Sequence, residues 1–102
     1  MEKTIAGFTV DVNEEGYLTN MEQWNVDIAK ELAKETDIEL SPRHVEVLEF
    51  LRDQQKNEVA LTIRGVGKSG FVDIKEFYAL FPKGPLKISS KYAGIPKPKS
   101  CI

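Results

Sequence analysis

The sequence predicts a mainly helical (α+β) fold: a small helical domain, an N-terminal β-hairpin and a flexible C-terminal arm. Apolar residues recur at helical spacing in several segments between residues 21 and 93. A stretch rich in β-branched and aromatic residues precedes these segments, and two prolines separated by one residue follow them. The chain has 102 residues, 41% of them hydrophobic, which suffices for one domain with a core.

The β-hairpin is predicted near the N-terminus. Residues 4–11 are rich in residue types that favour a strand. The turn signal Asn-Glu-Glu-Gly follows at residues 13–16, and Tyr17 and Leu18 come directly after it. We therefore expect the hairpin to turn at residues 13–16.

Two helices are predicted in the first half of the chain. Asn20 is a suitable N-cap for a helix over residues 21–35, and Gln23 would complete a capping box. Ser41 followed by proline is typical of a helix start, because the serine caps free N–H groups and the proline has none. This second helix is expected over residues 42–55.

In the second half of the chain, some segments predict their secondary structure less clearly than others. Residues 59–64 fit either a strand or a short buried helix, and the glycine-rich residues 65–70 predict a flexible turn. Asp73 should cap a helix that ends before Pro82, and a last helix is expected over residues 85–93 with Gly94 as its C-terminal cap. The face that the helix after Asp73 should bury consists of Ile74, Phe77, Leu80 and Phe81.

The composition excludes several classes of protein. No apolar run approaches ~18 residues, and the N-terminus lacks the long apolar run of a secretion signal. One cysteine and one histidine form neither an internal disulfide nor a four-ligand zinc site. We expect a cytoplasmic protein that uses no metal and no cofactor.

Charge is unevenly placed along the chain. Residues 83–102 carry five lysines and no acid, whereas residues 1–82 hold all 16 acidic residues and nine basic ones. Such a division predicts an acidic body with a basic terminal region. A basic tail suits nucleic acid, but this one is short and lacks arginine, so an acidic protein groove fits it at least as well.

Two local patterns resemble catalytic motifs without completing them. Residues 65–69 match the second half of a phosphate-binding P-loop, but Thr62 occupies the position of the first glycine, so a glycine-rich turn is favoured. His44 lies at the third position of the second predicted helix. We expect it to cap or pack there, rather than to act as a base on Cys101.

The sequence is also compatible with a helix–turn–helix arrangement. Helices that start after Ser41 and Asp73 could form a winged-helix-like core. Residues 73–81 contain Lys75 as their single basic residue, whereas DNA-binding helices need several. Direct nucleic-acid binding is therefore not expected.

The C-terminal arm carries the chain's sole cysteine. In residues 95–102, two prolines and two lysines precede Cys101, which is followed only by Ile102. Polyproline-like chain rises ~3.1 Å per residue, so Cys101 lies roughly 20 Å from the last helix. Because the thiolate is the nucleophile, acceptance of sulfur as a persulfide or mixed disulfide is its natural reaction. Lys97 and Lys99 favour the thiolate and the terminal carboxylate opposes it, so the sign of the net pKa shift stays open.

Two other interpretations of the arm remain open. A lone terminal cysteine is often incidental. Alternatively, Ser100, Cys101 and Ile102 form a C-terminal ligand for a PDZ-like groove, in which the cysteine plays no part. Prenylation is excluded because it requires a cysteine fourth from the end.

The arm from Ala93 to Ile102 closely resembles that of the DsrC/TusE family, sulfur carriers with a penultimate cysteine. The likeness extends over nearly the whole chain. Residues 80–85 look like the segment before the family's last helix, and residues 11–18, Trp24 and residues 40–52 are similar to its N-terminal half.

The resemblance implies a winged-helix-like domain over residues 1–94 and a flexible arm over residues 95–102, with Cys101 carrying the sulfur. The DsrC branch has a second cysteine where this chain has Ser90, so a disulfide within one chain is excluded. Arg64 matches a family arginine and is assigned to holding the arm. The stretch between Arg64 and Leu80 is several residues shorter than in other members. The arm residues assigned to partner binding are Gly94, Ile95, Pro96, Lys97, Pro98, Lys99 and Ile102.

The resemblance also implies a function. It favours a TusE-like relay, in which a persulfide passes from a TusBCD-type donor through Cys101 to a tRNA 2-thiouridylase, making the chain a sulfurtransferase in the carrier sense. One alternative is a DsrC-type gamma subunit that partners dissimilatory sulfite reductase or another sulfur-oxidation relay. The other is a non-catalytic C-terminal peptide ligand. The expected partners are proteins, with no membrane.

Overall fold

The computed structural model describes residues 1–59, 61–82 and 84–96. The described residues form a two-stranded antiparallel sheet, one 3₁₀ turn and five α-helices, which confirms the predicted fold class. The elements in chain order are β1 (Glu2–Ile5), β2 (Phe8–Asp11), η1 (Met21–Gln23), α1 (Val26–Lys34), α2 (Pro42–Lys56), α3 (Ile63–Lys68), α4 (Ile74–Leu80) and α5 (Pro85–Tyr92).

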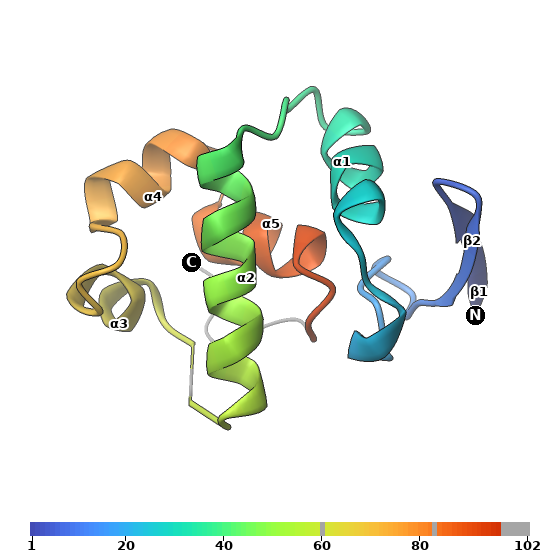
Figure 1. Ribbon diagram of the computed structural model, residues 1–102, viewed down its shortest axis with the longest axis horizontal. Helices are drawn as coiled ribbons and strands as arrows, with labels where there is room; N and C mark the ends of the chain where they lie inside the picture. The colour runs from blue at the N-terminus through green and yellow to red at the C-terminus, as the bar shows by residue number, and fades with distance from the viewer. Residues whose placement is uncertain (60, 83, 97–102) are drawn as a thin grey trace.

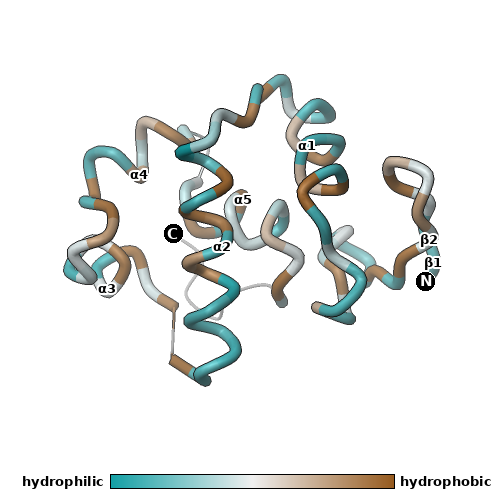
Figure 2. The backbone as a smooth tube through the Cα atoms, viewed as in Figure 1, coloured by the Kyte–Doolittle hydropathy of each residue, from teal (hydrophilic) through white to brown (hydrophobic). Residues whose placement is uncertain are grey.

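The last helix lies at the centre of the molecule. α5 packs against α1, α2 and α4, with α1 and the hairpin on one side of it and α3 and α4 on the other (Figure 1). Apolar and polar residues alternate along α1 and α2, as helices with one buried face require (Figure 2). The largest fully buried side chains are Tyr92, Phe77, Phe81, Leu18, Ile28, Leu32, Leu48, Leu51, Leu86, Ile95, Val10 and Val47.

The predicted β-hairpin is confirmed, but the predicted position of its turn was wrong. β1 and β2 are joined through Ala6 and Gly7, both with positive φ (54° and 85°). A two-residue turn of this hand matches the twist of paired strands, and a glycine accommodates it. Residues 13–16 instead make a second turn, which an isolated bridge between Val12 and Leu18 closes.

The first helix begins later than the sequence predicted. α1 starts at Val26, where the Asn25 side chain caps it, while Asn20 caps the separate turn η1. Gln23 does not complete a capping box. Its side chain accepts a hydrogen bond from the backbone N–H of Asp11 (2.8 Å) and donates one to the Asp11 carboxylate (3.3 Å). This contact with the end of β2 accounts for the break between η1 and α1.

The second helix follows its prediction closely. Ser41 caps α2, and proline occupies the first turn. Nδ1 of His44 accepts a hydrogen bond from the Ser41 backbone N–H (3.1 Å), and Nε2 donates one to the Leu80 carbonyl oxygen (2.9 Å). The expectation that His44 caps and packs is therefore confirmed.

The glycine-rich segment is helical, so the prediction of a flexible turn at residues 65–70 was wrong. The Thr62 side chain caps α3 by accepting a hydrogen bond from the Gly65 N–H (2.8 Å). A Cβ atom at Gly67 would overlap the side chain of Ile74, so this glycine permits close packing of α3 on α4. Ile74 stays 43% exposed, whereas the sequence placed it on the buried face.

Candidate functional site

The end of α5 forms a tight, capped turn just before the arm. Gly94 has a φ of +69° and donates its N–H to the Lys91 carbonyl oxygen (3.3 Å). The Ile95 N–H reaches back to the Ser90 carbonyl oxygen (3.2 Å). Together these bonds form a Schellman motif, which satisfies the carbonyl groups that a helix end leaves unpaired. The predicted role of Gly94 as the C-terminal cap is confirmed.

Trp24 holds this turn from the N-terminal side of the domain. Its indole Nε1 donates a hydrogen bond to the Tyr92 carbonyl oxygen (2.6 Å). A Cβ atom at Gly94 would lie 2.5 Å from the Trp24 Cδ1 atom, which is far inside van der Waals contact. A glycine is therefore needed at position 94 for two reasons: its φ is positive, and the indole ring leaves no room for a side chain.

Arg52 of α2 holds the same turn and is a residue that the sequence analysis missed. Its guanidinium donates to the Ala93 carbonyl oxygen (2.9 Å) and to the Met21 carbonyl oxygen (2.7 Å). It lies over the Trp24 ring, 4.5 Å from the centroid. Burial lowers the pKa of the Arg52 guanidinium from its ordinary value. The one local signal in the sequence was its position four residues after Leu48, one helical turn further along α2.

Arg64, to which the sequence assigned the holding of the arm, lies on α3 with an exposed side chain. No hydrogen bond or ion pair joins it to another residue of the described part of the chain. Its role in holding the arm stays a prediction. The structure instead places Arg52 at the last residues before the arm.

The predicted arm residues fall into two groups. Ile95 is fully buried, and Pro96 is the first exposed residue after α5. The division into a domain over residues 1–94 and an arm over residues 95–102 stays a prediction. An apolar residue at this point of a Schellman motif commonly packs on the helix that it follows. The remaining site residues lie outside the described residues: Lys97, Pro98, Lys99, Cys101 and Ile102.

Two adjacent buried serines on α5 differ in the hydrogen bonds of their hydroxyl groups. Both Ser89 and Ser90 are fully buried. The Ser89 hydroxyl donates to the Leu86 carbonyl oxygen (3.3 Å), as serines in helices commonly do. The Ser90 hydroxyl has no hydrogen-bond partner among the described residues.

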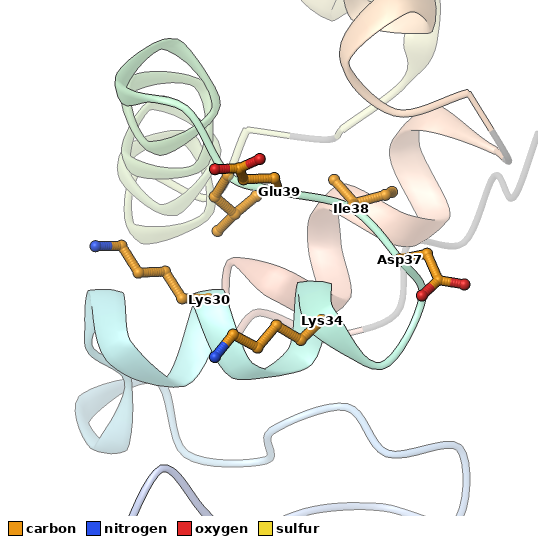
Figure 3. Close-up of a pocket in the computed structure, with 6 residues that line it drawn as sticks. Lys30, Lys34, Asp37, Ile38 and Glu39 are labelled. Atoms are coloured by element: carbon orange, nitrogen blue, oxygen red, sulfur yellow. The ribbon is translucent and has the colours of Figure 1, made fainter.

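A pocket of about 530 Å³ lies away from this turn, between α1 and the segment that leads to α2. Figure 3 shows Lys30 and Lys34 on α1, with Asp37 and Glu39 on the connecting segment. Charges of both signs line the pocket without a nucleophilic side chain or a predicted site residue.

Neither a metal site nor a membrane span is found in the described ranges. Within residues 1–59, 61–82 and 84–96, no group of three or more histidine, cysteine, aspartate or glutamate residues could hold a metal ion. No helix in the same ranges has the length and the apolar character needed to cross a membrane.

The fold and the capped end of α5 define a domain of the DsrC type. The chain is similar to the solution structure of Allochromatium vinosum DsrC, with a TM-score of 0.81 and 34% sequence identity over 100% of both chains. The family model described as "DsrC like protein" matches residues 4–102. The chain belongs to this DsrC-like family, as the resemblance of its arm implied.

Relatives with two different names match at similar identity. The gamma subunit of dissimilatory-type sulfite reductase from Nitratidesulfovibrio vulgaris is 38% identical over 105 residues, covering 99% of this chain and 98% of the relative. The sulfurtransferase TusE homologue of Haemophilus influenzae is 35% identical over 106 residues, covering 96% and 97%. Overall identity therefore does not separate the two branches.

Proposed function

We propose that this protein is a sulfur carrier that accepts sulfane sulfur as a persulfide on Cys101 and passes it to a partner protein. One observation carries the proposal: in a DsrC-like chain, the sole cysteine stands one residue from the C-terminus, seven residues after a firmly capped helix end. Relatives named sulfurtransferase TusE support the same activity.

The transfer reaction needs only a thiolate. The Cys101 thiolate attacks the terminal sulfur of a persulfide on the donor protein and forms a new S–S bond. The donor's own S–S bond breaks, and its electron pair remains on the donor as a thiolate. Transfer to the acceptor repeats the same exchange, so neither an oxidant nor a cofactor is consumed.

The anchored turn suits such a carrier. Arg52 and Trp24 hold the last carbonyl groups of α5, so the arm leaves the domain from a defined point. Five residues lie between Ile95 and Cys101, so six steps along an extended chain give a reach of about 20 Å. A thiol at that distance can enter a recessed site of a partner while the domain remains outside.

A single thiol decides how the carrier is discharged. Because Ser90 stands where the DsrC branch has its second cysteine, the persulfide on Cys101 has no resolving thiol within the chain. A second molecule must take the sulfur. We therefore favour a TusE-like relay toward tRNA 2-thiouridine, with protein donors and acceptors in the cytoplasm.

The alternative is a gamma subunit of dissimilatory sulfite reductase. Its support is the relative of that name at 38% identity. Co-purification of this protein with a sirohaem enzyme, and no transfer of its sulfur to a tRNA-modifying partner, would favour the alternative.

The test is intact mass after incubation with a persulfide-bearing donor protein. The wild type should gain the mass of one or more sulfur atoms, and Cys101→Ser should gain none. A matched control combines Cys101→Ser with Lys56→Cys, which puts the thiol on an exposed position of α2. That variant should fail to transfer its sulfur to the acceptor protein, even if the relocated thiol takes up sulfur from the donor.

Two outcomes would oppose the proposal. Absence of any adduct on the wild type with every protein donor would overturn it. If Cys101→Ser keeps full function in cells while deletion of Ile102 abolishes it, the chain acts as a C-terminal peptide ligand instead.

A further inference from the structure

The outer face of α4 leaves two large apolar side chains exposed. α3 and α4 lie together at the side of the molecule opposite the hairpin (Figure 1). Ile74 and Tyr78 are each 43% exposed, and because they are four residues apart on α4 they lie on one face of the helix. α3 packs closely beside Ile74 at Gly67, which has no side chain to cover it. The apolar pair therefore faces solvent next to α3, where a partner can cover it.

The same two helices carry three exposed basic residues. Arg64 and Lys68 lie about one turn apart on α3, and Lys75 follows Ile74 on α4. None of the three makes an ion pair or a side-chain hydrogen bond with another described residue. Their charges are therefore available to a binding partner.

The acidic residues of this segment already have other roles. Of the two within residues 61–82, Asp73 caps α4 by accepting a hydrogen bond from the Glu76 N–H (2.7 Å), and the Glu76 carboxylate binds Arg43 (2.9 Å). Residues 1–59, by contrast, hold 14 acidic and six basic residues. α3 and α4 therefore present a basic surface on an otherwise acidic body, and such a surface is complementary to an acidic partner.

An apolar pair with cations beside it fits an acidic amphipathic helix. Such a helix presents apolar side chains every three or four residues on one face and carboxylates along the borders of that face. The apolar face would cover Ile74 and Tyr78, and the carboxylates would meet the three cations. Nucleic acid fits this surface less well, because phosphates would pair with the cations but leave the apolar pair uncovered.

We propose that this α3–α4 surface (Arg64, Lys68, Ile74, Lys75 and Tyr78) docks an acidic amphipathic helix of the protein that donates sulfur. The inference rests on the proposed carrier function, and it assigns a partner to a surface outside the arm. A tRNA-modifying acceptor needs a positive surface of its own to hold RNA, so an acidic helix suits the donor better. Docking orients the domain on the donor, so that transfer no longer depends on a chance encounter of thiol and persulfide.

The test measures binding to the TusBCD-type donor complex of the expected relay, reduced so that it carries no persulfide. Every variant also carries Cys101→Ser, so no sulfur moves during the measurement. Tyr78→Ala should raise the Kd about tenfold, because an aromatic side chain is lost from the interface. Lys75→Glu should raise the Kd about fivefold at low salt and less at high salt, because ions screen the attraction between opposite charges.

Two variants remote from α3 and α4 serve as matched controls. Phe8→Ala removes an aromatic side chain of similar exposure (47%) from the hairpin, and Lys30→Glu reverses an exposed charge on α1. Neither should change the Kd. Urea denaturation should show Tyr78→Ala folded, because the Tyr78 side chain is exposed and makes no hydrogen bond with another described residue.

Several results would overturn the inference. Absence of binding, an unchanged Kd in Tyr78→Ala, or an equal rise in Phe8→Ala would show that the donor does not dock at this surface. If purified tRNA binds the chain, and Lys75→Glu weakens that binding while Tyr78→Ala does not, the surface binds nucleic acid instead. If the chain alone sediments as a dimer that Tyr78→Ala dissociates, the surface holds a second copy.

Sulfur loading of the same substitutions, in the chain that keeps Cys101, separates this inference from the proposed function. If Tyr78→Ala leaves donor binding unchanged while the wild type takes up sulfur, the docking surface fails and the carrier function stands. If Tyr78→Ala weakens donor binding but the donor never loads Cys101, the docking surface stands and the carrier function fails.

Discussion

Two arginines on α2 hold the two sides of the molecule in different ways. Arg43 faces α4, where its guanidinium binds the Glu76 carboxylate (2.9 Å) and lies over the Phe71 ring, 4.9 Å from the centroid. Arg52 faces the end of α5, where it lies over Trp24 and binds only backbone carbonyl oxygens. Both combine an aromatic ring with hydrogen bonds, but only Arg43 has its charge neutralised by an acid among the described residues.

The two arginines therefore have different roles. Arg43 makes a contact between α2 and α4, whereas Arg52 lies next to the end of α5, where the arm begins. The ion pair of Arg43 is partly exposed, so water screens it and its contribution to stability is small. Arg52 is partly buried, and its bonds join η1, α2 and the end of α5. Of these two arginines, the one without an acidic partner among the described residues therefore lies at the end of α5, just before the arm.

The largest loss of stability is expected from substituting Gly94, at the end of α5. Gly94→Ala should lower the free energy of unfolding by about 3 kcal/mol, since a left-handed conformation and a collision with Trp24 add together. Gly70, near α3 and α4, has a similar φ of +83° but open space around it. Gly70→Ala should cost only about 1 kcal/mol.

Urea denaturation of the two variants checks this expectation. The ratio between the two losses is informative, because the backbone strain is common to both glycines. Equal losses would mean that Trp24 does not confine Gly94, and the contrast between the two sides of the molecule would disappear.

The next largest loss of stability is expected from substituting the two arginines of α2. Arg52→Gln should lower the free energy of unfolding by about 2 kcal/mol, because two charge-assisted hydrogen bonds are lost at a partly buried site. Arg43→Gln should cost less, because its ion pair with Glu76 is partly exposed and screened by water. Thermal and urea unfolding of both variants measure the difference, and a larger loss in Arg43→Gln would contradict it.

Features set by neighbouring residues were predictable from the sequence. The caps at Ser41, Asp73 and Gly94 were predicted correctly, because each depends on residues within one helical turn. Cys101 lies outside the described residues, so its role as the sulfur-carrying residue stays a prediction.

Features set by distant contacts were missed. Arg52 meets its carbonyl partners 41 and 31 residues away in sequence, so its place one turn after Leu48 could not reveal these contacts. The late start of α1 depends on the contact of Gln23 with Asp11. At Gly67, the sequence cannot distinguish a glycine that permits bending from one that permits close packing on Ile74.

The smallest expected effect is the pH dependence of the Arg43 side. The hydrogen bond from Arg43 holds the pKa of Glu76 below its ordinary value of 4.5, so the pair stabilises the fold above about that pH. The stabilisation is lost as the pH falls through the lowered pKa. The stability difference between the wild type and Glu76→Gln should therefore be constant near neutral pH and shrink in acid.

Arg52→Gln provides the contrast in the same pH series. Its carbonyl partners do not titrate, so its difference from the wild type should not shrink over the range in which Glu76 takes up its proton. Urea titrations at several pH values measure both differences. If both shrank together in acid, an acidic group would have to pair with Arg52, and the contrast between the two arginines would disappear.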